Sequence, residues 1–303
     1  MAGKMIKVCQ KWFPHGTYKN QRGDGFLMNE ILKSNLDIYL KNITKDWSFT
    51  IIISGGGKVR VGKSVLAMQI ASYWAYQLKE LYGITVPFNI EDNFVFYWED
   101  LIENSNRVYS KTGRYFPMIY DEAGESLEGT KVLSSETKAV NDYLRECGQY
   151  NSLNILVLPE FFVLPRPIAV NYSDILINVF VETGEDEIFQ RGYAKFYSSR
   201  SKRRLFREGK RDLNYNIAPF DFDFRFHNVY TVSEAEYRER KQLALMGRDP
   251  KSKDKKVLER NTAVKILNKE FGLDIPQIMA IFKKYDGEIA ERTLKIVLKL
   301  RNS

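Results

Sequence analysis

Residues 51–64 read Ile-Ile-Ile-Ser-Gly-Gly-Gly-Lys-Val-Arg-Val-Gly-Lys-Ser, and this stretch decides the fold. An apolar run leads into the pattern Gly57-x-x-x-x-Gly62-Lys63-Ser64, and a helical pattern begins at Val65. Glycines at such positions let the backbone turn around an anion, while consecutive N–H groups and the helix N-terminus point at phosphate oxygens. The sequence therefore predicts a phosphate-binding loop between a buried strand and a helix.

This loop combines backbone donors with two functional side chains. Lys63 supplies a mobile cation for the terminal phosphates, and the Ser64 hydroxyl can ligate Mg²⁺. We expect the whole loop to contact the nucleotide, through Gly57, Lys58, Val59, Arg60, Val61, Gly62, Lys63, Ser64 and Val65.

A second carboxylate site is required because Mg²⁺ must also be held on the side away from the phosphates. Residues 116–123, Phe-Pro-Met-Ile-Tyr-Asp-Glu-Ala, supply a short apolar strand that ends in two acids. We expect Asp121 to hold the metal's coordination shell through water, and Glu122 to act as the catalytic acid-base group that polarises the attacking water. A solvated acidic turn is the simpler alternative, since further glutamates follow closely.

The motifs also separate nucleotide classes. A common GTPase carries Asn-Lys-x-Asp after a strand, whereas the nearest match here, residues 268–271, lacks the aspartate and falls in a predicted helix. A small-molecule kinase would not need the paired acids. Hydrolysis of ATP with Mg²⁺ is therefore the favoured prediction.

Composition and charge bound the class of protein. Of 303 residues, 44% are hydrophobic, which excludes wholesale disorder, and no apolar run is long enough for a membrane span. The N-terminus has no apolar signal core and there are two cysteines, so we expect a cytoplasmic protein, in the host cytoplasm if the chain is viral.

The net charge of +8 is unevenly spread along the chain. One short segment gathers many basic residues, which suits a phosphate backbone, DNA more than RNA, although a solvated surface hairpin is the alternative. The candidate nucleic-acid contacts are Lys195, Arg200, Lys202, Arg203, Arg204, Arg207, Lys210 and Arg211.

Five apolar runs alternate with helical stretches, as a parallel sheet with crossover helices requires. The predicted strands are Phe49–Ser54, Phe94–Trp98, Met118–Tyr120, Ile155–Leu158 and Ile175–Val181. The pattern indicates an α/β fold with flanking helices, a β-ribbon extension and a small C-terminal all-α domain.

The predicted domain boundaries follow from these runs. We expect an N-terminal extension and helix over 1–46, a P-loop ATPase domain over 47–245 with a basic β-ribbon near 187–212, a linker over 246–256 and a helical domain over 257–303. The last domain is compatible with a helix-turn-helix, and equally with plain trihelical packing or an oligomerisation module.

With these motifs, the chain resembles the P-loop ATPases that place an added strand between the two motif strands and carry a catalytic glutamate. Within that class it looks most like the branch of Zot-like phage assembly proteins, FtsK and HerA DNA pumps and viral genome-packaging ATPases. The resemblance rests on Gly57–Ser64, on Asp121-Glu122-Ala123 and on the segment from Arg145 to Leu158. It implies a sheet of order 5-1-4-3-2, with ATP at the carboxyl ends of strands 1 and 3.

Ring-forming members of this class complete the site with an arginine from the neighbouring subunit. The resemblance therefore implies a homo-oligomer, such as a ring, with Arg145 before strand four and Arg166 after it as candidate catalytic arginines; a surface salt bridge is the alternative for either. Three features depart from the family pattern: Lys58 lies where the ParA/MinD family has its signature lysine, Pro159-Glu160 replaces a polar sensor, and the membrane span of Zot-like proteins is missing from the sequence.

The resulting hypothesis is an ATPase that couples hydrolysis to DNA translocation, packaging or transfer in a viral or mobile-element setting. The alternative is a nucleotide-switched assembly factor that forms a filament or recruits a partner.

Overall fold

The structure is a computed structural model that describes residues 3–9, 25–121, 135–184, 186–247, 263–265, 267–269 and 271–284, together with Leu294 and Leu298. The chain divides into two compact units, Met1–Glu239 and Arg240–Ser303, and each is described by itself.

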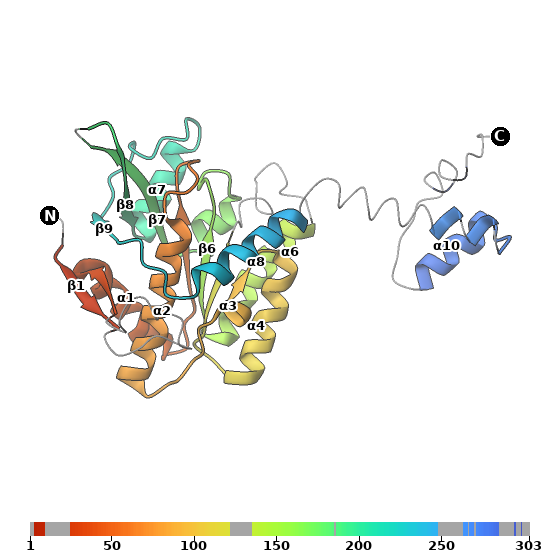
Figure 1. The fold of residues 1–303 in the computed structure, drawn as a ribbon, viewed down its shortest axis with the longest axis horizontal. Helices are drawn as coiled ribbons and strands as arrows, with labels where there is room; N and C mark the ends of the chain where they lie inside the picture. Colours follow the sequence, from red (N-terminus) through yellow and green to blue (C-terminus); the bar gives the residue numbers. More distant parts are fainter. Residues whose placement is uncertain are drawn as a thin grey trace. The chain divides into compact units, whose positions relative to one another are not determined.

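A seven-stranded sheet forms the centre of the first unit, with the strands in the order β4-β5-β6-β3-β7-β8-β9 (Figure 1). The five strands from β4 to β7 are parallel, and they are β3 (Phe49–Ser54), β4 (Phe94–Val95), β5 (Pro117–Tyr120), β6 (Leu153–Val157) and β7 (Ile175–Thr183). Numbered along the chain, they lie in the order 5-1-4-3-2. The predicted order is confirmed, and β6 separates β3 from β5.

Helices cover both faces of this sheet. Alternate residues of a strand point to opposite faces, so Ile52 joins an apolar cluster with α4 (Trp98–Thr112), α6 (Ser135–Glu146), the π-helical turn η5 (Pro167–Asn171) and α7 (Ser199–Gly209). Its neighbours Ile51 and Ile53 face the other side, where α2 (Lys63–Tyr82) packs on the sheet and α1 (Glu30–Ile43) packs on α2. All six residues of β3 are buried, which explains its unbroken apolar run.

The predicted basic β-ribbon near 187–212 is seen only in part: residues 189–197 form one strand, and the basic segment that follows is helical. β7 and β8 (Phe189–Tyr197) form an antiparallel hairpin, which extends past the neighbouring helices in Figure 1, and β9 (Phe222–Arg225) pairs with β8. Residues 199–209 form the helix α7 instead of continuing the ribbon. Leu205 and Phe206 are buried beneath it, so this segment gains more by packing as an amphipathic helix than by pairing as a strand.

The N-terminal extension contains more than the predicted helix. β1 (Met5–Val8) pairs with β2 (Phe26–Asn29) in a separate two-stranded sheet. Asn29 then caps α1, because its side-chain oxygen accepts from the backbone N–H groups of Ile31 and Leu32.

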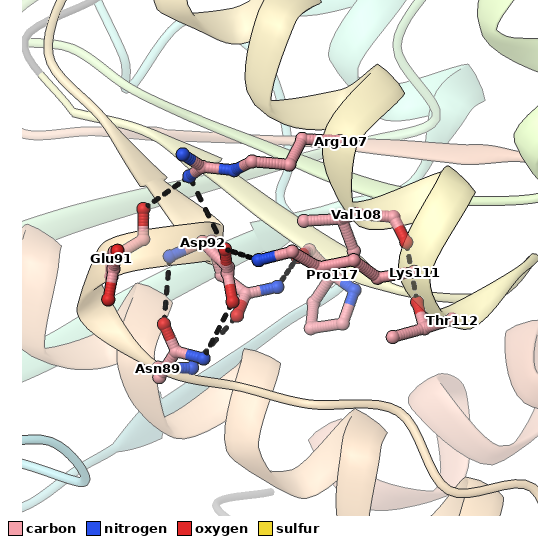
Figure 2. A network of polar contacts seen from close by, with 9 residues as sticks. Asn89, Glu91, Asp92, Arg107, Val108, Lys111, Thr112 and Pro117 are labelled. Carbon is pink, nitrogen blue, oxygen red and sulfur yellow. Dashed lines mark hydrogen bonds and ion pairs between the residues drawn. The ribbon is translucent and has the colours of Figure 1, made fainter.

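A polar network joins the short helix that precedes β4 to α4, which follows β4 (Figure 2). The carboxylate of Asp92, near the end of α3 (Ile90–Asn93), forms ion pairs with Arg107 and Lys111 of α4, both at 3.3 Å. Burial tends to raise the pKa of Asp92, but hydrogen bonds from Asn89 and Lys111 and the two positive charges lower it below its usual value. These charges hold α3 against α4 and belong to the scaffold.

The described part of the second unit contains α10 (Ile275–Lys284). Two reciprocal hydrogen bonds cap its N-terminus. Gln277 N–H donates to Asp274, and Asp274 N–H donates to Gln277, each at 2.9 Å. Val264, Ile278 and Leu294 form a small buried cluster. Most of the predicted linker over 246–256 and most residues after Lys284 lie outside the described residues. None of the described helices has both the length and the apolar character needed to cross a membrane.

Candidate nucleotide site

The loop between β3 and α2 closes around the position where phosphate is expected. Its entry is tied to the end of β6, because the N–H groups of Gly55 and Gly57 both donate to the Pro159 carbonyl, at 3.1 and 2.8 Å. Gly56 and Gly57 have positive φ, and so does Arg60 at 58°. These positive φ values let the backbone turn tightly between β3 and α2, as the glycine-rich pattern predicts.

Gly62, at the start of α2, is required by both its conformation and its neighbour. Its φ is 103°, and a Cβ added there would lie 3.1 Å from the ring of Phe226, which follows β9. The ammonium of Lys63 folds back across the loop and donates to the Lys58 carbonyl at 2.6 Å. Lys63 is therefore held over the loop, at the place where its charge would meet the terminal phosphates.

Ser64 and Asp121 meet as the sequence predicts for a magnesium site. The Ser64 hydroxyl donates to the Asp121 carboxylate at 3.0 Å and lies 3.2 Å from its other oxygen. Asp121, at the end of β5, is 1% exposed. A hydroxyl and a carboxylate are the oxygen ligands that suit Mg²⁺, which completes its shell with water and phosphate. These two residues would hold the ion, and the ion would neutralise charge on the phosphates.

A third residue shares this carboxylate, and no motif in the sequence marks it. The hydroxyl of Tyr237 on α8 (Glu234–Gly247) donates to Asp121 at 2.5 Å. Tyr237 is buried and packs against Phe94, Phe96 and Tyr230. Asp121 therefore accepts hydrogen bonds from two elements, the start of α2 and α8.

A second polar group lies where β6 ends beside the loop. The hydroxyl of Tyr215 donates to Glu160 at 2.5 Å, and the N–H of Phe162 donates to the same carboxylate oxygen at 3.1 Å. The other oxygen of Glu160 lies 3.9 Å from the place that a Gly57 Cβ would occupy. Glu160 thus stands at the position where the family pattern places a polar sensor.

The remaining predicted catalytic residues are Glu122, Arg145 and Arg166. Glu122 lies outside the described residues. Arg145 is exposed at the end of α6 and pairs with Asp142 at 3.1 Å and with Glu146 at 3.0 Å. Arg166 is exposed in the loop between β6 and η5. Both arginines stay candidates for a role in a neighbouring subunit.

The basic segment presents one exposed face. Arg200, Arg203, Arg204 and Arg207 follow helical spacing on α7, and we call these four residues the arginine face. Glu208, which pairs with Arg204 and Arg207, is the one acidic residue in the helix sequence. Arg211 follows the helix and is also exposed, whereas Lys210 donates to the Leu164 carbonyl at 3.3 Å.

Two predicted nucleic-acid contacts do not belong to this face. Lys195 on β8 donates to Asn216 at 3.1 Å and lies over the rings of Phe180 and Phe220. The prediction for Lys202 is wrong, because its side chain is fully buried and its ammonium donates to the carbonyl and, at 2.6 Å, to the hydroxyl of Ser173. Lys202 anchors α7 to the start of β7 instead.

The buried ammonium of Lys202 gives a prediction for stability against pH. Burial lowers its pKa from 10.5 to about 7, although Asp174 opposes the shift. The unfolded chain therefore binds more protons between these two values, and the free energy of unfolding should rise with pH over this window by about 2–4 kcal/mol. Urea denaturation of Lys202→Met, compared with wild type near each end of the window, should show a flatter dependence on pH. Parallel curves for the two proteins would contradict this assignment.

By its sheet order and its phosphate-binding loop, the chain has the fold of the P-loop NTPases. The added strand β6 between β3 and β5 gives it the sheet order of the additional-strand P-loop ATPases.

Comparison with solved structures finds distant likenesses. Similar solved structures include the genome packaging NTPase B204 of Sulfolobus turreted icosahedral virus 2, 17% identical over 52% of this chain and 94% of that one, with a TM-score of 0.33. Another is the N-terminal domain of zonular occludens toxin from Neisseria meningitidis, 9% identical over 50% of this chain and 84% of that one, with a TM-score of 0.35. A third is the ORC2 protein of Aeropyrum pernix, 14% identical over 56% and 48%, with a TM-score of 0.32. No protein-family model matches the sequence, and no curated protein matches it. Because these structural likenesses are distant, the function is inferred from the residues of the nucleotide site.

Proposed function

We propose that this protein is a Mg²⁺-dependent ATPase that acts as an oligomer and couples hydrolysis to the translocation, packaging or transfer of DNA. The hydrolytic part rests on the Lys63 ammonium, which lies across the loop, and on the adjacent Ser64–Asp121 pair, which would hold Mg²⁺. Such a site binds and orients a nucleoside triphosphate and stabilises charge that develops on its terminal phosphate.

The nucleic-acid part is carried by one observation, the arginine face of α7. Four guanidinium groups lie along one exposed side of a helix that is held at both ends. Guanidinium groups match phosphate geometry, and a row of them fixed on a rigid element suits a regularly charged polymer better than a single small anion. The setting would be a viral or mobile-element one, as the family resemblance implies.

Replacing Arg203 and Arg207 by alanine tests this proposal directly. If each contacts one phosphate, the slope of the logarithm of the DNA binding constant against the logarithm of salt concentration should become shallower by about 2. Affinity at low salt should fall together with the slope. Fluorescence anisotropy with a labelled duplex over a salt series measures both.

Arg114→Ala is the matched control for this experiment. Arg114 is an exposed arginine of the same unit that pairs with Asp46 at 3.4 Å, away from α7. Arg114→Ala removes one positive charge, as each of the two test substitutions does, and it should leave the slope near the wild-type value. Equal slopes for wild type, control and the double variant would reject α7 as the nucleic-acid surface.

Turnover separates a motor from the alternative assembly factor. A motor should hydrolyse ATP continuously and be stimulated severalfold by DNA, whereas a switch should turn over slowly and change its oligomeric state with the nucleotide. Particle size with and without an ATP analogue and DNA gives the second measurement.

We also propose that an arginine from a neighbouring subunit completes the site, and Arg166 is the stronger of the two candidates. The guanidinium of Arg145 is already held by two carboxylates of its own helix, which it would have to leave. Exposed pairs of this kind cost little to break, so they rank Arg166 before Arg145 without excluding Arg145.

A further inference from the structure

The loop after α7 turns back beneath the phosphate-binding loop. Asn214 N–H donates to the Gly209 carbonyl at 3.1 Å, and Asn216 N–H donates to the Asn214 side chain at 2.8 Å. This turn places Tyr215 between the end of α7 and the nucleotide site. The carbonyl of Tyr215 accepts from the buried hydroxyl of Tyr197 on β8 at 3.0 Å.

Tyr215 contacts the end of β3 and the residues that follow β6. Its hydroxyl lies 3.3 Å from the Ser54 hydroxyl at the end of β3, accepts from Phe161 N–H at 2.9 Å and donates to Glu160 at 2.5 Å. Its ring lies 3.6 Å from the place that a Gly56 Cβ would occupy. The ring therefore forms part of the floor beneath the phosphate-binding loop.

α7 is rigidly joined to this group. Phe206 packs on Phe161 with ring centroids 5.6 Å apart, and Phe162 packs on Tyr215 at 4.8 Å. Gly209 is so closely packed that an added Cβ would lie 2.8 Å from Phe162. A shift of α7 would therefore displace the residues that follow β6, including Glu160.

Tyr215 stays a hydrogen-bond donor because burial, together with the Glu160 charge, raises the pKa of its hydroxyl. The bond matters for the nucleotide because a carboxylate beside a polyanionic phosphate is unfavourable unless donors hold it and spread its charge. Removing the hydroxyl while keeping the ring leaves Glu160 with one donor fewer on the same oxygen.

We propose that Tyr215 is a positioning residue that couples the arginine face of α7 to the nucleotide site by holding Glu160 against the phosphate-binding loop. The inference rests on the proposed function, since the ligand of the arginine face is taken to be DNA. DNA bound along α7 then sets the position of Glu160 and with it the rate of hydrolysis.

The test is the ratio of ATP turnover with saturating duplex DNA to turnover without it. The wild-type ratio should be about fivefold or more, a typical coupling between two sites. Tyr215→Phe should bring the ratio close to one while its DNA affinity, measured by anisotropy, stays at the wild-type value. The KM for ATP, measured with and without DNA, should also lose its response to DNA.

Two further variants separate coupling from damage to the fold. Tyr197→Phe removes a neighbouring buried hydroxyl that bonds to the Tyr215 carbonyl and leaves the Glu160 bond in place, so it should keep the wild-type ratio. Glu160→Gln keeps an oxygen that can accept from Tyr215 and should retain coupling, which Tyr215→Phe in that background should abolish.

The outcomes distinguish this inference from the proposed function. A Tyr215→Phe protein that binds DNA and keeps the wild-type ratio overturns the inference alone, as does an equal loss of the ratio in Tyr197→Phe. A wild-type protein without ATP turnover, or without salt-sensitive DNA binding, overturns both.

Discussion

Lys63→Ala is expected to lower ATP turnover by at least about 100-fold, the cost of removing one preorganised group that stabilises transition-state charge. The ammonium lies across the loop, 2.6 Å from the Lys58 carbonyl, and would move a short way to meet the terminal phosphates. Because hydrolysis develops negative charge there, an alanine takes away the cation where it matters most. Phosphate release at saturating ATP and Mg²⁺ measures the loss.

Lys58→Ala is the matched control for this variant. It removes an exposed lysine from the same loop but keeps the main-chain carbonyl that receives Lys63. We expect this variant to retain most of its turnover, and both variants to unfold within about 1 kcal/mol of wild type because neither side chain is buried. Wild-type turnover in Lys63→Ala would refute ATP hydrolysis at this site.

The central fold was predictable because its strands are buried on both faces. A parallel strand covered by helices on both sides reads as a continuous apolar run, as in Phe49–Ser54, and the crossover helices between such runs fix their order once the family resemblance is recognised. The phosphate-binding loop was predictable for a related reason. Its glycines serve backbone geometry at fixed spacing, so the pattern is visible in the sequence.

The helix α7 was missed because its sequence lacks apolar periodicity. Leu205 and Phe206 are its large apolar residues, and the next buried position on the same side is taken by Lys202, whose charge reads as surface. A lysine can fill an apolar position when its ammonium finds acceptors, and here Ser173, far away in the sequence, supplies them. No residue within or beside 199–209 indicates that Ser173 is the hydrogen-bond partner of Lys202.

The supporting tyrosines of the site could not be predicted from the sequence either. Tyr215 and Tyr237 reach Glu160 and Asp121 from 55 and 116 residues away along the chain, and neither lies in a recurring motif. Motifs mark the groups that touch the nucleotide. The groups that hold those residues in place are set by the fold of each particular chain, and a structure is needed to find them.

Asp121→Asn is expected to lower turnover and apparent Mg²⁺ affinity by about 10–100-fold, the usual cost of altering a group that orients a metal's shell. The carboxylate is buried and already accepts from Ser64 and Tyr237, so it is fixed before any ion arrives. An amide keeps the shape and one acceptor oxygen, but it loses the charge that attracts the ion. Titrating Mg²⁺ at saturating ATP separates the two effects, since lost affinity can be restored by excess metal and a lost rate cannot.

Tyr237→Phe should change the same titration in the same direction by a smaller factor. The phenylalanine keeps the packing against Phe94, Phe96 and Tyr230, and it removes only the 2.5 Å bond to Asp121. Because the hydroxyl acts through the carboxylate, adding Tyr237→Phe to Asp121→Asn should cost little more than Asp121→Asn alone. Additive losses in the double variant would show that Tyr237 acts elsewhere. Non-additive losses would establish that Tyr237 acts through Asp121. In that case α8, the helix that leads into the C-terminal unit, helps to position a proposed magnesium ligand.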